Sequence, residues 1–279
     1  MPSELIEFHG MPAVRWGIPG GASATATMQG AHLVSWTLPA GEECLFVSER
    51  SPFEAGSAIR GGIPVVFPQF ADRGPLAQHG FARTRDWTFI DGLDTADGSR
   101  ARFRLESSDE TLALWPSRFR LELSATIRGT RLDVQLQVVN TGEASMSFMA
   151  ALHTYLRVSD AAKLRLGGLR GMTYLERGSS ERKVEAREQV TADEPIDRIY
   201  FVAPPATRLE DGQRVVRIVQ RNFSDTVVWN PGRERTARMV DMAPDGFRRM
   251  LCVEAAAIEP PVVLAPGATW LASQSIERE

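Results

Sequence analysis

The chain has 279 residues, 43% of them hydrophobic, which is enough for a sizeable core without disulfides or a structural metal. Its 32 basic and 35 acidic residues give a net charge of −3, which excludes the basic footprint of a nucleic-acid-binding protein. Two cysteines, Cys44 and Cys252, are too few for a disulfide scaffold or a thiolate metal site.

Neither end of the sequence nor its middle indicates a membrane protein. The N-terminal segment lacks the basic region and apolar stretch of a secretory signal. The longest apolar runs, such as 63–67 and 261–265, are far too short to cross a bilayer. We therefore expect a cytoplasmic protein without a membrane or nucleic-acid partner. No shift in composition divides the chain, so one domain is expected over residues 1–279.

Alternation of apolar and polar residues predicts β-strands along most of the chain. Short strands are expected at 14–16, 32–38 and 101–105, and a capped helical turn at 108–114 that Pro116 ends. Residues 119–138 alternate on both sides of Gly129-Thr130, which predicts a hairpin with one buried face. Residues 178–197, rich in Glu, Arg and Thr, are expected to form a solvated loop. Further strands are expected at 215–219, 226–229 and 270–274.

These elements predict an all-β protein built as a large antiparallel β-sandwich. The strand pattern alone does not separate a sandwich from an open barrel. Three clusters within this framework carry residues that could perform chemistry.

The first cluster joins Arg60-Gly61-Gly62 to His79 and Arg83. Paired glycines could let the backbone approach a ligand, while the guanidinium supplies a contact to an anion or hydroxyl. His79 precedes a glycine in a loop, where its imidazole would be available. The alternative, which spacing alone favours, is a tight turn with a solvated arginine and a surface histidine.

The second and third clusters place His153 and Glu254 within apolar strands. A histidine there costs desolvation unless its ring nitrogens are hydrogen-bonded, so it is either a bonded core residue or an acid or base on a concave sheet. Glu254 could pair with Arg248 or Arg249, or act as a base. A carboxylate and two histidines suit general acid–base chemistry, and also a His/His/Glu metal site. Without a closely spaced ligand pair we prefer the acid–base interpretation and expect no cofactor and no metal.

Six motifs in sequence order resemble the hexose-6-phosphate mutarotases of the aldose 1-epimerase superfamily. The resemblance runs from about residue 30 to the C-terminus. The motifs are Arg60-Gly-Gly-Ile-Pro, His79-Gly-Phe-Ala-Arg83, Ala151-Leu-His153-Thr-Tyr, Asp197-Arg-Ile-Tyr200, Val228-Trp-Asn-Pro231 and Cys252-Val-Glu254-Ala.

This resemblance implies a galactose-mutarotase-like β-sandwich with an open, concave sugar site and no cofactor. It implies interconversion of the α and β anomers of an aldohexose 6-phosphate, with glucose 6-phosphate as the first candidate. By resemblance, Glu254 is the base that takes the C1 hydroxyl proton, and His153 is the acid at the ring oxygen. His79 would lie beside the reacting oxygens, and Asp197 would hold sugar hydroxyls.

The resemblance also assigns the phosphate to Arg60 and Arg83. Gln78 stands where some family members carry a phosphate-binding lysine, so Arg73 or Arg85 could compensate for the lost charge. The expected partner is a small sugar phosphate, and the protein is expected to be a monomer. A non-catalytic carbohydrate-binding module, a mutarotase of unphosphorylated aldoses, and a glycoside hydrolase using Glu254 with Asp197 remain as alternatives.

Overall fold

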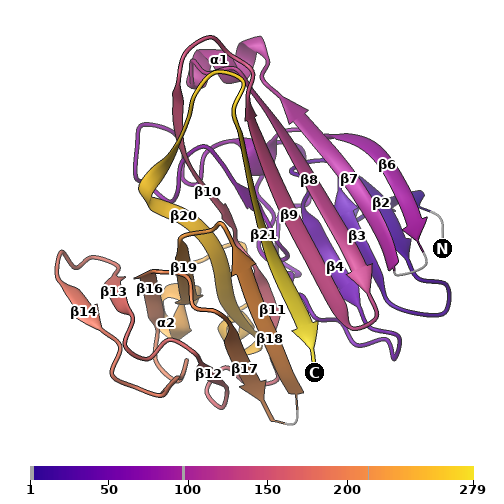
Figure 1. The fold of residues 1–279 in the computed structure, drawn as a ribbon. Helices are drawn as coiled ribbons and strands as arrows, with labels where there is room; N and C mark the ends of the chain where they lie inside the picture. The colour runs from indigo at the N-terminus through magenta and orange to yellow at the C-terminus, as the bar shows by residue number, and fades with distance from the viewer. Residues whose placement is uncertain (1–2, 96–97, 213) are drawn as a thin grey trace.

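The computed structural model describes residues 3–95, 98–212 and 214–279, which form three antiparallel sheets (Figure 1). The strands are β1 (Glu4–Phe8), β2 (Met11–Gly17), β3 (Ser23–Thr27), β4 (Leu33–Thr37), β5 (Val65–Val66), β6 (Thr88–Thr95), β7 (Gly98–Glu106), β8 (Phe119–Arg128), β9 (Arg131–Asn140), β10 (Met146–Leu152), β11 (Tyr155–Arg157), β12 (Arg165–Gly167), β13 (Thr173–Glu176), β14 (Arg182–Val184), β15 (Gln189–Val190), β16 (Ile196–Phe201), β17 (Thr207–Asp211), β18 (Arg214–Arg221), β19 (Asp225–Asn230), β20 (Met250–Leu264) and β21 (Thr269–Arg278). The helical elements are α1 (Asp109–Leu114), α2 (Gly232–Thr236) and the 3-10 turns η1 (Ala82–Thr84) and η2 (Gly246–Arg249).

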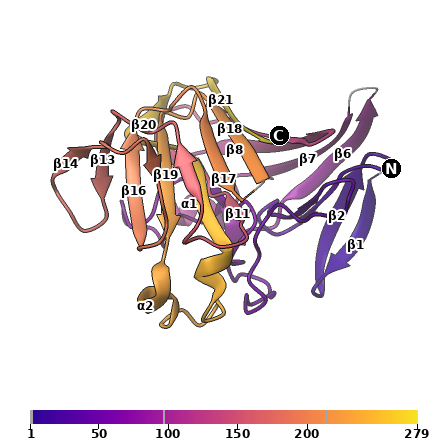
Figure 2. The ribbon, with the colours of Figure 1, turned by 90° about the horizontal axis from the view of Figure 1, so that it is seen from below.

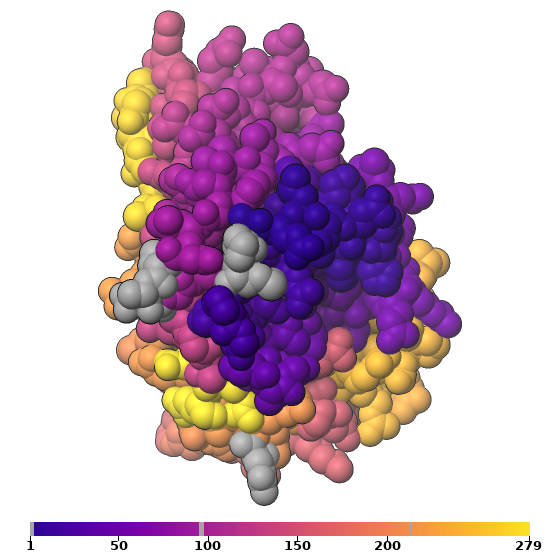
Figure 3. Space-filling model, turned by 90° about the vertical axis from the view of Figure 1, so that its right-hand side faces the viewer, coloured from indigo at the N-terminus to yellow at the C-terminus, as the bar shows by residue number. Residues whose placement is uncertain are grey.

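The described residues confirm the predicted all-β sandwich. A nine-stranded sheet has the order β15-β12-β17-β18-β21-β9-β8-β7-β6, and an eight-stranded sheet has the order β14-β13-β16-β19-β20-β10-β5, with β11 also paired to β20. A third sheet, β1-β2-β3-β4, packs on the first: the rings of Trp16 and Phe103 are 6.3 Å apart. In Figure 3 its indigo strands lie beside the magenta part of the nine-stranded sheet.

The predicted hairpin is confirmed as β8 and β9. Side chains at alternate positions of β8, from Phe119 to Ile127, are buried, and Ile127 faces Leu132 across the turn. Gly129 makes this turn at a positive φ of 56°. The predicted capped turn is confirmed as α1, whose first turn is capped by the Ser108 side chain accepting from the backbone N–H of Thr111.

Strand β20 positions the site because its two faces meet different surroundings. Leu251, Val253 and Ala255 join the main core, while Cys252 and Ala256 belong to two smaller apolar clusters on the other face. Glu254 lies between these clusters on that second face. The loops before β5 and after α2 contribute to them, and α2 itself projects beyond the end of β19 (Figure 2).

The expectation of a solvated loop at 178–197 is wrong in part. The segment contains β14 and β15, and Glu185 within it is buried. The carboxylate of Glu185 accepts hydrogen bonds from Arg187, Arg198 and Tyr200, and these partners make its burial tolerable. Among the described residues, no helix is long and apolar enough to cross a membrane.

Candidate active site

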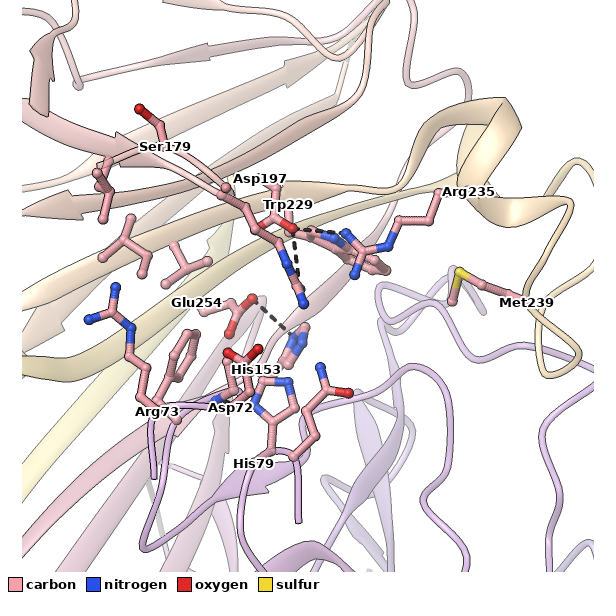
Figure 4. Close-up of a pocket in the computed structure, with 18 of the residues that line it drawn as sticks. Asp72, Arg73, His79, His153, Ser179, Asp197, Trp229, Arg235, Met239 and Glu254 are labelled. Atoms are coloured by element: carbon pink, nitrogen blue, oxygen red, sulfur yellow. Dashed lines mark hydrogen bonds and ion pairs between the residues drawn. The ribbon is translucent and has the colours of Figure 1, made fainter. Parts of the chain in front are cut away.

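A cavity of about 460 Å³ opens on the second face of the eight-stranded sheet (Figure 4). Strands β16, β19 and β20 contribute Asp197, Trp229 and Glu254 to its wall, and His153 lies in the break between β10 and β11. His79 reaches the cavity from the loop after β5. The structure therefore brings together the acid–base candidates that lie far apart in the sequence.

His153 and Glu254 are neighbours at the base of this cavity. Nδ1 of His153 lies 3.3 Å from Oε1 of Glu254, and the two residues are 6% and 1% exposed. The sequence placed His153 within a strand, but the ladder stops at Leu152. There the backbone N–H groups of His153 and Tyr155 donate to the Pro64 and Gly62 carbonyls instead. Arg248 pairs with Asp160, and Arg249 lies closest to Asp245, so neither serves Glu254.

Three aromatic rings hold the His153 imidazole. Tyr155 stacks on it with centroids 4.7 Å apart, while Trp229 and His79 contact it edge to face at 6.1 and 5.3 Å. Such a packed ring keeps one orientation relative to Glu254. Figure 4 shows His79, His153 and Glu254 gathered at one end of the cavity.

Burial opposes charge on both members of the pair. It raises the pKa of the Glu254 carboxyl well above its ordinary value, and the nearby Asp197 charge adds to this rise. Burial also lowers the pKa of His153, helped by the positive charges of Arg60 and Arg83. Burial therefore favours the uncharged forms of both groups, a carboxylic acid and a neutral imidazole.

His79 is buried rather than freely exposed, which corrects the expectation of an available loop histidine. The backbone N–H of Ala71 lies 3.3 Å from Nδ1 and donates to it, so the neutral ring carries its proton on Nε2. Burial, followed by the charges of Arg83 and Arg60, lowers the pKa of His79 to about 3. His79 can therefore donate a hydrogen bond from Nε2 while remaining uncharged at neutral pH.

Gly61 and Gly62 do not line the cavity, and the surrounding backbone leaves no room for a side chain at either position. A side chain at Gly61 would lie 2.2 Å from the Phe46 carbonyl oxygen, and one at Gly62 would lie 2.1 Å from that of Leu33. The glycines are thus required by the close approach of two backbone segments. Their packing fixes the position of the backbone at the neighbouring residue, Arg60.

Arg60 lines the cavity but is already paired. Its Nη2 lies 2.8 Å from Oδ2 of Asp241, and its Nη1 donates to the Tyr155 hydroxyl at 3.1 Å. The guanidinium of Arg83 donates to the Gln78 carbonyl at 2.8 Å. Gln78 lines the cavity, whereas Arg83 is not among its lining residues.

Asp197 lies in the opposite wall between two arginines that the sequence analysis missed. Its Oδ2 lies 2.9 Å from Nη1 of Arg235 and 3.6 Å from Nη1 of Arg177. Arg235 also lies over the Trp229 ring, 5.6 Å from its centroid. Its position shortly after the Val228-Trp-Asn-Pro231 motif was the only sequence signal for it.

Arg73 and Arg85 are the two arginines that could compensate for the missing lysine at position 78. Arg73 lines the cavity, as does Asp72 beside it. Arg85 instead pairs with Glu110 at 2.8 Å and does not line it.

The described residues offer one group that could hold a metal ion. It consists of His153, Cys252 and Glu254. Cys252 therefore replaces the second histidine of the His/His/Glu set that the sequence suggested. His32 is also buried, and its Nε2 lies 2.7 Å from the Gly61 carbonyl oxygen.

Comparisons with known proteins identify the family and the fold. A family model described as aldose 1-epimerase matches residues 12–277. A protein of Cenchrus ciliaris, provisionally named glucose-6-phosphate 1-epimerase, is 34% identical over 254 residues, covering 87% of this chain and 77% of that protein. An Escherichia coli K12 protein with the same provisional name is 35% identical over 246 residues, covering 84% and 79%. The crystal structure of a provisionally named mutarotase from Salmonella typhimurium superposes with a TM-score of 0.91 at 27% identity, covering 99% of this chain and 93% of that one.

Proposed function

This chain belongs to the aldose 1-epimerase family, and we propose that it interconverts the α and β anomers of an aldohexose 6-phosphate, glucose 6-phosphate first. The observation that carries the proposal is the buried pair of His153 and Glu254, 3.3 Å apart and facing a sugar-sized cavity. Anomer exchange needs one group that accepts a proton and one that donates a proton in the same encounter. We infer that the substrate is phosphorylated from the names of the relatives.

In the proposed reaction, Glu254 takes the proton from the C1 hydroxyl while His153 gives a proton to the ring oxygen. The C1–O5 bond breaks and an open-chain aldehyde forms. Rotation about C1–C2 presents the other face of the carbonyl to O5. Ring closure then returns both protons with the roles reversed, so the enzyme ends as it began.

We infer that one proton transfer within the pair lets it serve in both directions. The resting state, a carboxylic acid beside an imidazole, differs from the reactive carboxylate–imidazolium state by one proton transfer. A polar sugar seated against the pair replaces lost hydration and stabilises the charged state. The total proton count of the site stays constant throughout.

The surrounding residues would hold the sugar in place. We assign Nε2–H of His79 to a hydrogen bond with the reacting oxygens, because its Nδ1 already accepts from the Ala71 backbone. We assign Asp197 to sugar hydroxyls, since Arg235 fixes its carboxylate at the rim. Trp229 offers an apolar face beside them.

For the phosphate we propose Arg60 as the principal contact. Its side chain lines the same cavity as His153. It also donates a hydrogen bond to the hydroxyl of Tyr155, whose ring stacks on His153. Arg83 adds positive potential beside Gln78. Because Asp241 already pairs with Arg60, the phosphate has to share this guanidinium with a carboxylate or displace it.

Other features support a simple soluble-enzyme setting for this reaction. We propose that the protein is active as a monomer. Both cysteines are free, which suits the reducing cytoplasm. A glycoside hydrolase is less well supported, because the closest ionisable partner of Glu254 is an imidazole rather than a second carboxyl group.

The substrate assignment can be tested with a panel of sugars. Saturation-transfer NMR should show faster anomer exchange for glucose 6-phosphate than for glucose at equal concentrations of enzyme and sugar. Exchange of glucose alone would replace the phosphorylated substrate with a free aldose. Binding of glucose 6-phosphate without faster exchange would leave only a carbohydrate-binding module.

A further inference from the structure

Directly beside the His153–Glu254 pair lies a third side chain that the proposed reaction does not use. Cys252 precedes Glu254 by two positions on β20, so both side chains leave the same face of the strand. Its backbone lies opposite Tyr155 of β11, two residues after His153. One ligand atom each from His153, Cys252 and Glu254 lies within 4.8 Å of the other two, and all three residues are buried.

Two atoms of this trio lack the partners that buried polar groups normally have. Nδ1 of His153 and Oε2 of Glu254 are buried and make no hydrogen bond with any residue that the structure describes. The two residues are 6% and 1% exposed, and both line the cavity. A group arriving from the cavity could therefore satisfy both atoms at once.

We propose that His153, Cys252 and Glu254 bind a thiophilic divalent cation, with Zn²⁺ as the best match. Imidazole nitrogen, thiolate sulfur and carboxylate oxygen are its usual protein ligands. Zinc bonds of about 2.0–2.3 Å at tetrahedral angles place ligand atoms roughly 3.3–3.8 Å apart. The His153–Glu254 separation of 3.3 Å already fits, and the 4.8 Å limit leaves a side-chain adjustment of about 1 Å.

The charges of the site also favour a dication. A thiolate and a carboxylate balance Zn²⁺ beside a neutral imidazole, so the buried complex carries no net charge. The protons of the thiol and the carboxyl group leave to solvent when the ion binds. Three protein ligands leave a fourth position, which faces the cavity and can take water.

Occupation of this site inhibits the proposed mutarotase, a consequence that rests on the proposed function. The cation takes the lone pair of the Glu254 base and of the His153 nitrogen, so neither can exchange a proton with the sugar. Inhibition is competitive with the sugar, because the ion and its water occupy the base of the same cavity. Chelation restores activity. The binding itself does not depend on the reaction.

Co²⁺ gives a readout that is independent of activity. Titration of the metal-free full chain with Co²⁺ should produce a thiolate-to-cobalt charge-transfer band, which Zn²⁺ then abolishes by displacement. Cys252→Ser and Cys252→Ala should lose the band and bind Zn²⁺ at least about tenfold more weakly, the smallest loss expected for a metal-site residue. Cys44→Ser is the matched control and should keep it, since Cys44 lies outside this group.

The outcomes separate the two proposals. No charge-transfer band, or a band that survives in both Cys252 variants, overturns the metal site even if the metal-free enzyme exchanges anomers. A metal-free wild type without anomer exchange overturns the proposed function, and the cobalt titration still decides the metal site. The metal proposal stands if Cys252→Ser exchanges anomers like the wild type and resists Zn²⁺.

Discussion

Arg60 and Asp241 form an ion pair at the edge of the cavity: their Nη2 and Oδ2 atoms are 2.8 Å apart, although the two residues are 181 positions apart in the sequence. The side chains are 26% and 21% exposed, so solvent screens the pair only in part. The pair places a negative charge beside the guanidinium that we assign to the substrate phosphate. Asp241 should therefore weaken the binding of a phosphorylated sugar.

The variant Asp241→Asn tests this relationship. Removing the carboxylate charge should lower the KM for glucose 6-phosphate by about fivefold, corresponding to roughly 1 kcal/mol, and leave the KM for glucose unchanged. Steady-state kinetics with both sugars measures the difference. A rise in the KM for glucose 6-phosphate would mean that Asp241 holds Arg60 in its binding position instead.

Arg235 is predicted to position Asp197 for sugar hydroxyls. Arg235→Met removes the 2.9 Å ion pair and the contact over Trp229, so the KM should rise about fivefold with little change in kcat. Arg238→Met is the matched control, because Arg238 is exposed and makes a side-chain contact only with the Glu234 carbonyl oxygen among the described residues. Equal kinetics for both variants would remove Arg235 from the site.

Two buried histidines predict a loss of stability in mild acid. Burial lowers the pKa of His32 to about 4 and that of His79 to about 3, from an ordinary value of 6.5. The unfolded chain therefore binds protons that the folded chain rejects, so stability is fully present above pH 6.5 and is lost as pH falls toward 4. Each histidine contributes about 1.4 kcal/mol per pH unit.

Urea unfolding at pH 7 and pH 5 measures this effect. The free energy of unfolding should be roughly 4 kcal/mol lower at pH 5, with 1.5 pH units below 6.5 counted for each of two histidines. His32→Gln should reduce the difference by about half. Equal stability at the two pH values would show that neither histidine is kept neutral by the fold.

Alanine substitutions at Gly62 and Gly129 distinguish the cost of a steric clash from the cost of backbone strain. Their φ values are 64° and 56°, so alanine is similarly strained at both positions. At Gly62 the new methyl group would also lie 2.1 Å from the Leu33 carbonyl oxygen, whereas at Gly129 nothing lies within 4 Å. Gly62→Ala should therefore cost about 3 kcal/mol more than Gly129→Ala in urea unfolding. Similar costs would show that the segments can move apart.

The sequence predicts the fold well where one sheet face is buried and the other is wet. The β8–β9 hairpin has this pattern over its full length, and it was located with its turn. The segment 178–197 was misread because the burial of Glu185 depends on Arg198 and Tyr200, which have no local signature. Charged composition alone resembles that of a solvated loop.

Of the candidate site, only the residues that belong to the six motifs could be predicted from the sequence. His79, His153 and Glu254 do line one cavity, as the resemblance implied. The pairing of Arg60 with Asp241 and the position of Arg235 could not be predicted, because they depend on contacts between segments distant in sequence. The close packing of Gly61 and Gly62 against the Phe46 and Leu33 backbone likewise has no local signature.

The most direct test of the central claim is anomer exchange of glucose 6-phosphate by saturation-transfer NMR, with wild type compared with Glu254→Gln and His153→Gln. Both substitutions keep a polar side chain but remove the proton exchange, so exchange above the buffer rate should fall by about 10²-fold or more. No other histidine should replace His153 fully. Wild-type exchange equal to the buffer rate, or undiminished exchange in Glu254→Gln, would contradict the proposal.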